Sequence, residues 1–166
     1  ENLGLSGAQL AVVDSNKSSK FLNQNYSLIT KISYDENELI QAFEEFVKNK
    51  NSYVILNVED ELLKKIIANP ISKDTLLINA GSQTTDLRRD YCNKNLLHTI
   101  ASNAMLYDGL VQFLVKRNFK NIFLITGKDP KDIQISDDIK RAVKKFGAKI
   151  VKEKVWNNNT DIRRRA

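Results

Sequence analysis

Short apolar runs rich in β-branched and aromatic residues alternate along this chain with longer amphipathic segments. Three of these runs, Tyr53–Val58, Thr75–Asn79 and Asn121–Thr126, are bounded by polar turn residues and are typical of buried strands. Strands that alternate with helices form βαβ units, whose parallel sheet is covered by helices on both faces. The sequence therefore predicts an α/β fold, a doubly wound three-layer sandwich with a mainly parallel sheet.

The same periodicities place the remaining elements. Apolar residues spaced three and four apart predict helices, and alternation with β-branched residues predicts further strands. The expected helices cover residues 5–13, 36–48, 61–68, 104–117 and 139–146, another begins at Thr160–Asp161, and the further strands cover 26–32, 98–99 and 149–155.

Polar and glycine residues predict where some of these helices begin and end. Asp35 is expected to cap the helix over residues 36–48, and Ser136 or Asp137 the helix that follows them. Gly147 is expected to be the C′ residue of that second helix. The polar residues 14–19 predict a loop after the first helix.

Composition excludes several classes of protein. The 166 residues are 42% hydrophobic and 28% charged, which fits one domain with a core of ordinary size. No apolar run approaches the roughly 20 residues that a membrane-spanning helix needs, so direct membrane insertion is not expected. Ten Lys and Arg in residues 140–166, against Glu153 and Asp161, account for the net charge of +6, and the rest of the chain is slightly acidic. Nucleic acid is therefore not an expected partner.

Catalytic and metal-binding residues are not predicted. Cys92 and His98 are the single cysteine and the single histidine, so neither an internal disulfide nor a zinc site is expected. No Ser and Asp are spaced to form a triad with His98. Gly127 and Lys128 follow a strand but lack the partner glycine of a phosphate-binding loop. We expect no enzymatic activity, no metal and no cofactor.

Binding chemistry is expected at the carboxyl edge of the sheet, where ligands of open α/β folds bind. The run Thr75–Asn79 ends in a loop of neutral donors and acceptors: Gly81, Ser82, Gln83 and Thr84. Such a loop suits direct contact with a small polar ligand, and it is equally compatible with an ordinary strand-to-helix turn.

Two other loops at this edge also allow two interpretations. Asp60 follows a strand and could receive an amine or a cation. Alternatively, Asp60 or Glu59 could cap the helix that follows and favour its dipole. Ser102 and Asn103 precede a helix, whose open amides could accept an anionic group or could simply be capped by these side chains.

Three segments resemble one known family. Gly7–Ala11, Leu77–Leu87 and Leu97–Asn103 are similar to the corresponding segments of type I periplasmic binding proteins of the branched-chain amino-acid-binding class, in their first lobe. Asn79–Gly81, Cys92–Thr99, Ala104–Leu110 and Phe123–Gly127, among other segments, resemble more closely the substrate-binding proteins associated with pyrroloquinoline-quinone (PQQ)-dependent alcohol oxidation.

The resemblance implies two lobes joined by a hinge, a small-molecule ligand closed between them, and an ABC transporter permease in the inner membrane as partner. It implies a periplasmic protein whose signal peptide has been removed. It also implies that residues 1–166 form a single α/β lobe, a fragment without the family's first strand and second lobe. The ligand-facing candidates that follow by position are Asp60, Gly81, Ser82, Gln83 and Asn103.

The candidate residues depart from the pattern of the family's amino-acid binders. The family places a short hydroxyl residue at Asp60, threonine at Gln83 and aspartate at Asn103. An asparagine at position 103 removes a carboxylate that would anchor an ammonium group. A small polar metabolite other than an amino acid is therefore the expected ligand.

The leading functional hypothesis is a solute-binding protein for uptake. Neutral hydrogen bonds from the loop of Ala80–Thr85 and from the helix start at Ser102 would hold one end of the ligand. Two alternatives remain open: the effector-binding core of a regulator or sensor, which shares this architecture, and a flavodoxin-like or nucleotide-binding enzyme.

Overall fold

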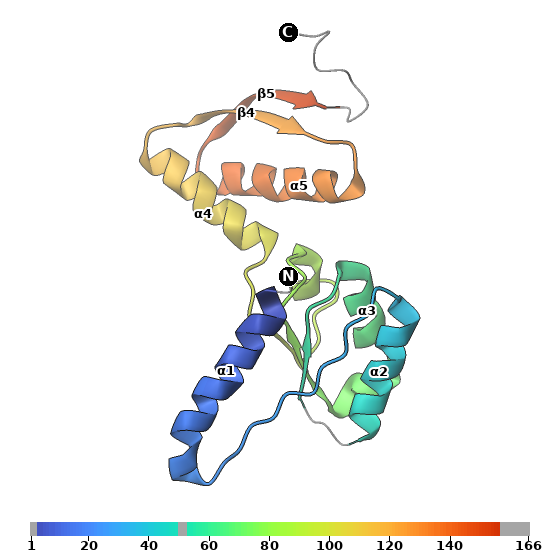
Figure 1. Cartoon of the computed structure of the whole chain (residues 1–166). Helices are drawn as coiled ribbons and strands as arrows, with labels where there is room; N and C mark the ends of the chain where they lie inside the picture. Colours follow the sequence, from blue (N-terminus) through green and yellow to red (C-terminus); the bar gives the residue numbers. More distant parts are fainter. Residues whose placement is uncertain (1–2, 50–52, 157–166) are drawn as a thin grey trace, which may run out of the picture. The chain divides into compact units, whose positions relative to one another are not determined.

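The computed structural model describes residues 3–49 and 53–156 (Figure 1). The chain divides into two compact units. The first comprises Glu1–Gly81 with Lys94–Leu97, and the second comprises Ser82–Asn93 with His98–Ala166. None of the helices in the described ranges is long and apolar enough to span a membrane.

The first unit is built on a sheet whose strand order is β1-β2-β3. Hydrogen bonds pair β1 and β2 in parallel, with Val54 opposite Leu77 and Leu56 opposite Asn79. The elements are α1 (Leu3–Ser19), the 3-10 turn η1 (Lys20–Leu22), α2 (Glu36–Lys48), β1 (Tyr53–Leu56), α3 (Asp60–Ala68), the 3-10 turn η2 (Pro70–Asp74), β2 (Leu76–Asn79) and β3 (Leu96–His98), whose last residue is grouped with the second unit.

Alternation along β1 decides which face of this sheet is buried. Val54 and Leu56 are buried, whereas Tyr53 and Ile55, which alternate with them, are exposed. The helices α2 and α3 pack against each other and lie on the same side of the strands (Figure 1). Their apolar faces supply Phe43, Leu62, Leu63 and Ile66, all of which are buried.

The second unit pairs a parallel two-stranded sheet with two helices. Its elements are the 3-10 turn η3 (Thr85–Arg88), α4 (Asn103–Lys116), β4 (Asn121–Thr126), α5 (Pro130–Lys145) and β5 (Lys149–Val155). Both helices lie on one face of the sheet (Figure 1). Val111 of α4 meets Ala142 and Val143 of α5 in a buried cluster, and Ile122 and Ile150 of the strands pack onto it.

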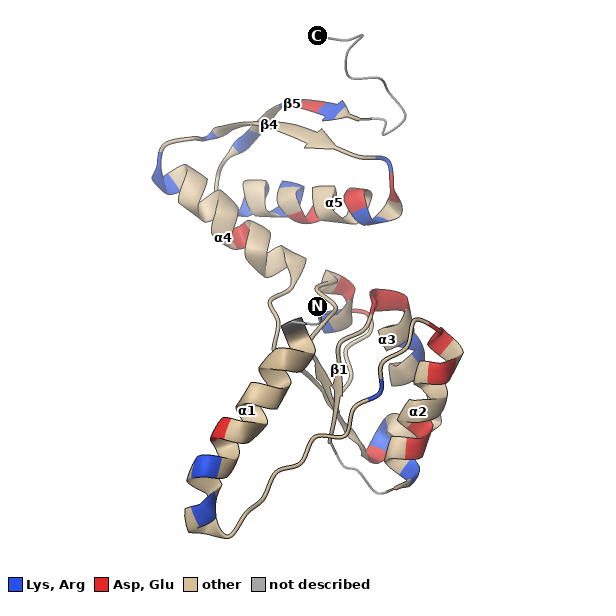
Figure 2. Ribbon diagram, viewed as in Figure 1, with Lys and Arg blue, Asp and Glu red and all other residues tan. Residues whose placement is uncertain are grey.

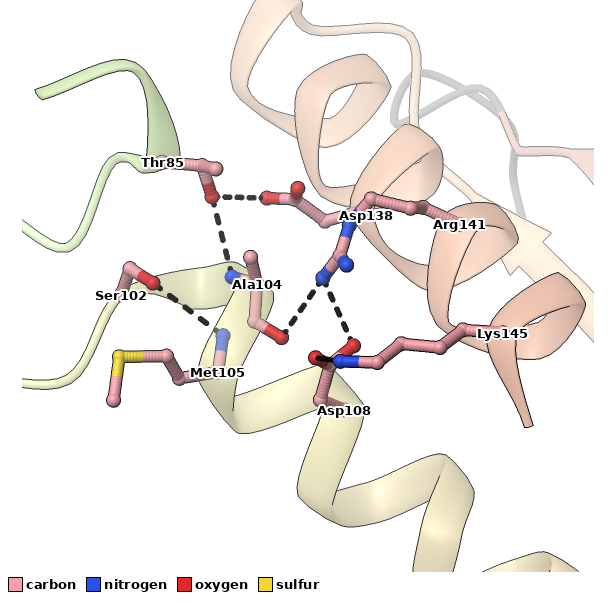
Figure 3. Close-up of polar contacts among 8 residues, drawn as sticks. All are labelled: Thr85, Ser102, Ala104, Met105, Asp108, Asp138, Arg141 and Lys145. Carbon is pink, nitrogen blue, oxygen red and sulfur yellow. Dashed lines mark hydrogen bonds and ion pairs between the residues drawn. The ribbon is translucent and has the colours of Figure 1, made fainter. Parts of the chain in front are cut away.

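A charged network adds to this helix pairing. Arg141 donates a hydrogen bond of 2.9 Å to Asp108 Oδ1, and Lys145 donates one of 2.6 Å to Asp108 Oδ2 (Figure 3). The hydrogen bond from Lys145, with the positive charge of Arg141, holds the pKa of Asp108 below its usual value. A carboxylate of α4 is thus shared by two cations of α5.

Most of the predicted elements are confirmed. The bounds of α2, β4 and β5 agree with those expected, and Asp35 caps α2 by accepting from the backbone N–H of Asn37 at 2.7 Å. Gly147 follows α5 with a φ of +72°, as a C′ glycine should. The predicted helix start at Thr160–Asp161 lies outside the described residues.

Three predictions about local structure are wrong. Residues 26–32 form no strand, because a strand needs a partner and the backbone of Tyr26 instead bonds at both its N–H and its carbonyl with the side chain of Asn16. The helix α1 continues through the expected loop at 14–19, where Lys17 and Asp14 form an ion pair of 2.8 Å. Pro130 begins α5, so neither Ser136 nor Asp137 starts that helix.

Two glycines of the second unit should respond oppositely to alanine. Gly147→Ala forces a side chain into a positive φ and should lower the free energy of unfolding by about 1 kcal/mol. Gly109 lies within α4 with open space around it, so Gly109→Ala should raise the free energy of unfolding by about 0.5–1 kcal/mol. Urea unfolding followed by circular dichroism measures both. A gain in stability for Gly147→Ala would contradict the described backbone.

The depressed pKa of Asp108 predicts a pH dependence of stability. Its stabilising effect is complete above the unfolded-state pKa and is lost as the pH falls through the lower folded-state value. Asp108→Asn should therefore cost about 1 kcal/mol at pH 7 and progressively less below about pH 4. Urea unfolding of the parent and of Asp108→Asn between these pH values measures this cost. Asp137→Asn, which changes an exposed carboxylate of α5, is the control. If Asp108→Asn lowered the free energy of unfolding equally at pH 7 and below about pH 4, the depressed pKa of Asp108 would be refuted.

Candidate functional site

In the first unit, the loops that follow β1 and β2 lie side by side. The backbone N–H of Ala80 donates to the carbonyl of Leu56 at 2.9 Å, which continues the pairing of the two strands by one residue. The buried side chain of Asn79 accepts the N–H of Gly81 at 3.2 Å and so shapes the turn after β2. The carboxyl edge thus brings Gly81 next to the loop that leads to Asp60.

Gly81 is required by a close approach of backbone to backbone. A Cβ atom at this position would lie 2.7 Å from the backbone nitrogen of Val58, 2.9 Å from its carbonyl oxygen and 2.8 Å from Asn57 Oδ1. The role of Gly81 within this unit is therefore to let two loops touch.

Asp60 is the first residue of α3 and is half-buried. Glu59 occupies the N-cap position, but its side chain makes no capping hydrogen bond. Asp60 and Glu61 therefore place negative charge in the first turn, where it favours the helix dipole (red at the start of α3 in Figure 2). This arrangement fits the structural interpretation of Asp60 and leaves its ligand-binding role a prediction.

In the second unit, the loop of Ser82–Thr85 is joined to the start of α4. The N–H of Asn103 donates to the carbonyl of Gln83 at 2.8 Å. The N–H of Ala104 donates to the Thr85 hydroxyl oxygen at 3.2 Å (Figure 3). Two successive amides of the helix are therefore held by the loop, and Gln83 and Asn103 lie next to each other.

The third amide of α4 is held by the cap. Ser102 is 1% exposed, and its hydroxyl oxygen accepts the N–H of Met105 at 3.4 Å (Figure 3). All of the first three amides thus have acceptors within the protein. The capping interpretation of Ser102 is confirmed, whereas an anion bound at these amides would have to displace existing hydrogen bonds.

The candidate residues of this loop differ in how accessible they are. Ser82 and Thr84 are each 3% exposed, and the Thr84 hydroxyl oxygen accepts from Gln134 Nε2 of α5 at 2.9 Å. Gln83 and Asn103 are half-buried and so carry their side-chain amides closer to solvent. These two are the most accessible of the predicted residues in the second unit. Asp60 and Gly81 belong to the first unit, which is described separately.

His98 is half-buried near the positively charged Arg88, whose guanidinium donates to the carbonyl of Ile100 at 2.6 Å. Burial lowers the pKa of His98, and the charge of Arg88 lowers it further, so the imidazole is neutral at pH 7.

Beyond β4, the Asp132 carboxylate lies where a Cβ on Gly127 would be, which disfavours a phosphate there. In the described ranges, no cluster of His, Cys, Asp or Glu could hold a metal ion.

Sequence analysis missed two residues that hold the loop from α5. Gln134 binds Thr84, and Asp138 accepts the hydroxyl of Thr85 at 2.6 Å. Fifty or more positions separate each of these pairs in the sequence. The spacing of apolar residues indicates local secondary structure only. A single sequence therefore gives no signal for hydrogen bonds between segments this far apart.

The close approach at Gly81 gives a testable consequence. Gly81→Ala should push the two loops of the first unit apart and lower the free energy of unfolding by about 1–3 kcal/mol, because the clash is with backbone atoms. Gly7→Ala is the matched control, since Gly7 lies in α1 with nothing near its Cβ direction. Thermal unfolding monitored by circular dichroism compares them. If both variants keep the parent's stability, the close approach does not exist.

Solved structures of ABC transporter proteins share this fold. The chain matches the substrate-binding protein from Desulfitobacterium hafniense in complex with Leu, with a TM-score of 0.80 and 16% identity over 96% of this chain and 48% of that one. A branched-chain amino acid ABC transporter periplasmic ligand-binding protein from Burkholderia xenovorans gives a TM-score of 0.78 and 17% identity, over 94% and 42%. A solute-binding protein from R. palustris in complex with benzoate gives 0.58 and 12%, over 90% and 44%.

These comparisons fix the fold class and the family. The chain spans about half the length of the solved structures that it matches. A search of curated proteins finds no match. A family described as periplasmic binding protein matches residues 2–164, which is nearly the whole chain. The α/β fold predicted from the sequence is confirmed, with parallel sheets that match one lobe of that family's fold. The chain therefore belongs to the periplasmic binding protein family.

Proposed function

We propose that this chain is part of the solute-binding component of an ABC-type uptake system and that it contacts a small, uncharged polar metabolite. The family match over residues 2–164 supports the solute-binding role. The observation that carries the ligand contact is the 2.8 Å hydrogen bond from the N–H of Asn103 to the carbonyl of Gln83. It brings the backbones of two half-buried residues together, and each of these residues carries a side-chain amide with donors and an acceptor.

The chemistry of this pair favours a neutral ligand group. The first three amides of α4 are already hydrogen-bonded within the protein, so the helix start offers little to a carboxylate. The side chains of Gln83 and Asn103 carry no charge and can both donate to and accept from a hydroxyl, carbonyl or amide. Affinity would come from pairing these groups fully as water is excluded.

Hinge closure is the proposed mechanism, with residues 1–166 as a single lobe that lacks the family's first strand and second lobe. The rest of the protein would then supply the opposite wall of the site. Asp60 and Gly81 of the first unit and Ser82, Thr84 and Ser102 of the second remain ligand-binding candidates. Ser82, Thr84 and Ser102 are buried and would act by shaping their own loops. Periplasmic location, after removal of a signal peptide, and an inner-membrane permease as partner follow from the same proposal.

The narrower proposal concerns the biological setting. The link to PQQ-dependent alcohol oxidation rests on the sequence resemblance alone. The structural neighbours are named for leucine, branched-chain amino acid and benzoate binding or transport, so they support solute binding without supporting that link. A protein of this kind binds and releases its ligand unchanged, and we expect no catalysis.

Ligand binding by the intact protein tests the proposal. A thermal-shift panel of short alcohols, carboxylic acids including benzoate, L-leucine and PQQ selects the compound that raises the unfolding temperature most. Gln83→Ala and Asn103→Ala should each weaken its binding by about tenfold in calorimetry, because each removes a desolvated hydrogen bond.

The control is Gln112→Ala, which removes an exposed amide from α4 away from its start. It should bind as the parent does. Unchanged affinity in both Gln83→Ala and Asn103→Ala would show that the ligand lies elsewhere.

A further inference from the structure

Two side chains on one face of α5 hold the loop of Ser82–Thr85, which contacts the start of α4. Gln134 donates to the Thr84 hydroxyl oxygen at 2.9 Å, and the Thr85 hydroxyl donates to Asp138 Oδ2 at 2.6 Å. Gln134 and Asp138 are four residues apart in sequence, which places them one turn apart on the same side of the helix. Thr84, Thr85 and Asp138 are each no more than 6% exposed, so both contacts are shielded from water.

The single hydrogen of the Thr85 hydroxyl fixes the direction of these bonds. The hydroxyl oxygen accepts the N–H of Ala104 at 3.2 Å, and its one hydrogen is then donated to Asp138 (Figure 3). A buried carboxylate of α5 is thus connected through the loop to the first turn of α4.

We propose that Asp138 is a positioning residue for the ligand contacts of this protein. Through Thr85 it fixes the loop of Ser82–Thr85 against the start of α4. The loop in turn sets the spacing between the side chains of Gln83 and Asn103. This inference rests on the proposed function, because that function takes Gln83 and Asn103 as ligand contacts.

The packing of α4 on α5 does not depend on Asp138. Val111, Ala142 and Val143 form the buried cluster between the helices, and Arg141 and Lys145 add the ion pairs to Asp108. Loss of the Asp138 carboxylate should therefore loosen the loop while the helices stay paired. This local effect distinguishes positioning from general stabilisation.

Amide hydrogen exchange of the full protein without ligand tests the proposal. In Asp138→Ala, the amides of Asn103 and Ala104 should exchange about tenfold faster than in the parent, because the acceptors that hold them become mobile. Asp138→Asn keeps an oxygen that can accept from Thr85 and should restore slow exchange. Asp137→Ala removes the neighbouring, exposed carboxylate and should leave exchange unchanged.

A second variant separates positioning from loss of stability. Asp108→Ala removes the α4–α5 ion pairs and leaves the acceptors of the Asn103 and Ala104 amides in place. It should therefore lower the free energy of unfolding without selectively speeding the exchange of these two amides. The proposal is overturned if the amides of Asn103 and Ala104 still exchange slowly in Asp138→Ala. It is also overturned if Asp138→Ala speeds amide exchange throughout α4 and α5 to the same extent, as is expected for Asp108→Ala. The exchange measurement uses no ligand, so its outcome does not depend on the calorimetric binding test. A failure of the proposed function can therefore be distinguished from a failure of this proposal.

Discussion

The amides at the start of α4 must find acceptors, and the way in which they do so organises the second unit. A helix leaves its first N–H groups without partners of its own. Here the carbonyl of Gln83 takes the first, the hydroxyl of Thr85 the second and the hydroxyl of Ser102 the third. The loop after β2 is therefore bound to a helix that begins about twenty residues later in the chain. That contact brings together the backbones of Gln83 and Asn103, the two residues that we propose face the ligand.

The same contact bears on the kind of ligand. An open helix start attracts carboxylates and phosphates, whereas a start whose amides are occupied offers only side chains. Gln83 and Asn103 are neutral amides, and the histidine of the chain is kept neutral by burial and by Arg88. The loop of Ser82–Thr85 itself carries only neutral side chains, and the Asp138 carboxylate contacts it through the hydroxyl of Thr85. Among the structural neighbours, the complexes with leucine and benzoate both hold a carboxylate-bearing ligand. The chain shares their fold, and we propose a neutral ligand group for its polar loop.

Sequence patterns predicted those parts of the structure that local forces determine. The amphipathic face of α2 and its cap at Asp35, the strands β4 and β5, and the positive φ of Gly147 all follow from neighbouring residues. Residues 26–32 have strand-like composition, but composition supplies no pairing partner. The start of α5 was misplaced because Pro130 at the first helical position outweighs the polar residues near Ser136. In the candidate site, the cap at Ser102 was predictable, whereas the hydrogen bonds of Gln134 and Asp138 join distant segments.

The central claim is that the start of α4 is occupied by the protein's own loop and is closed to anions. Isotope-labelled intact protein titrated with benzoate and, in parallel, with benzamide tests this directly. The account predicts that benzoate leaves the amide resonances of Asn103, Ala104 and Met105 where they are. A saturable shift of these three amides with benzoate and not with benzamide would contradict it.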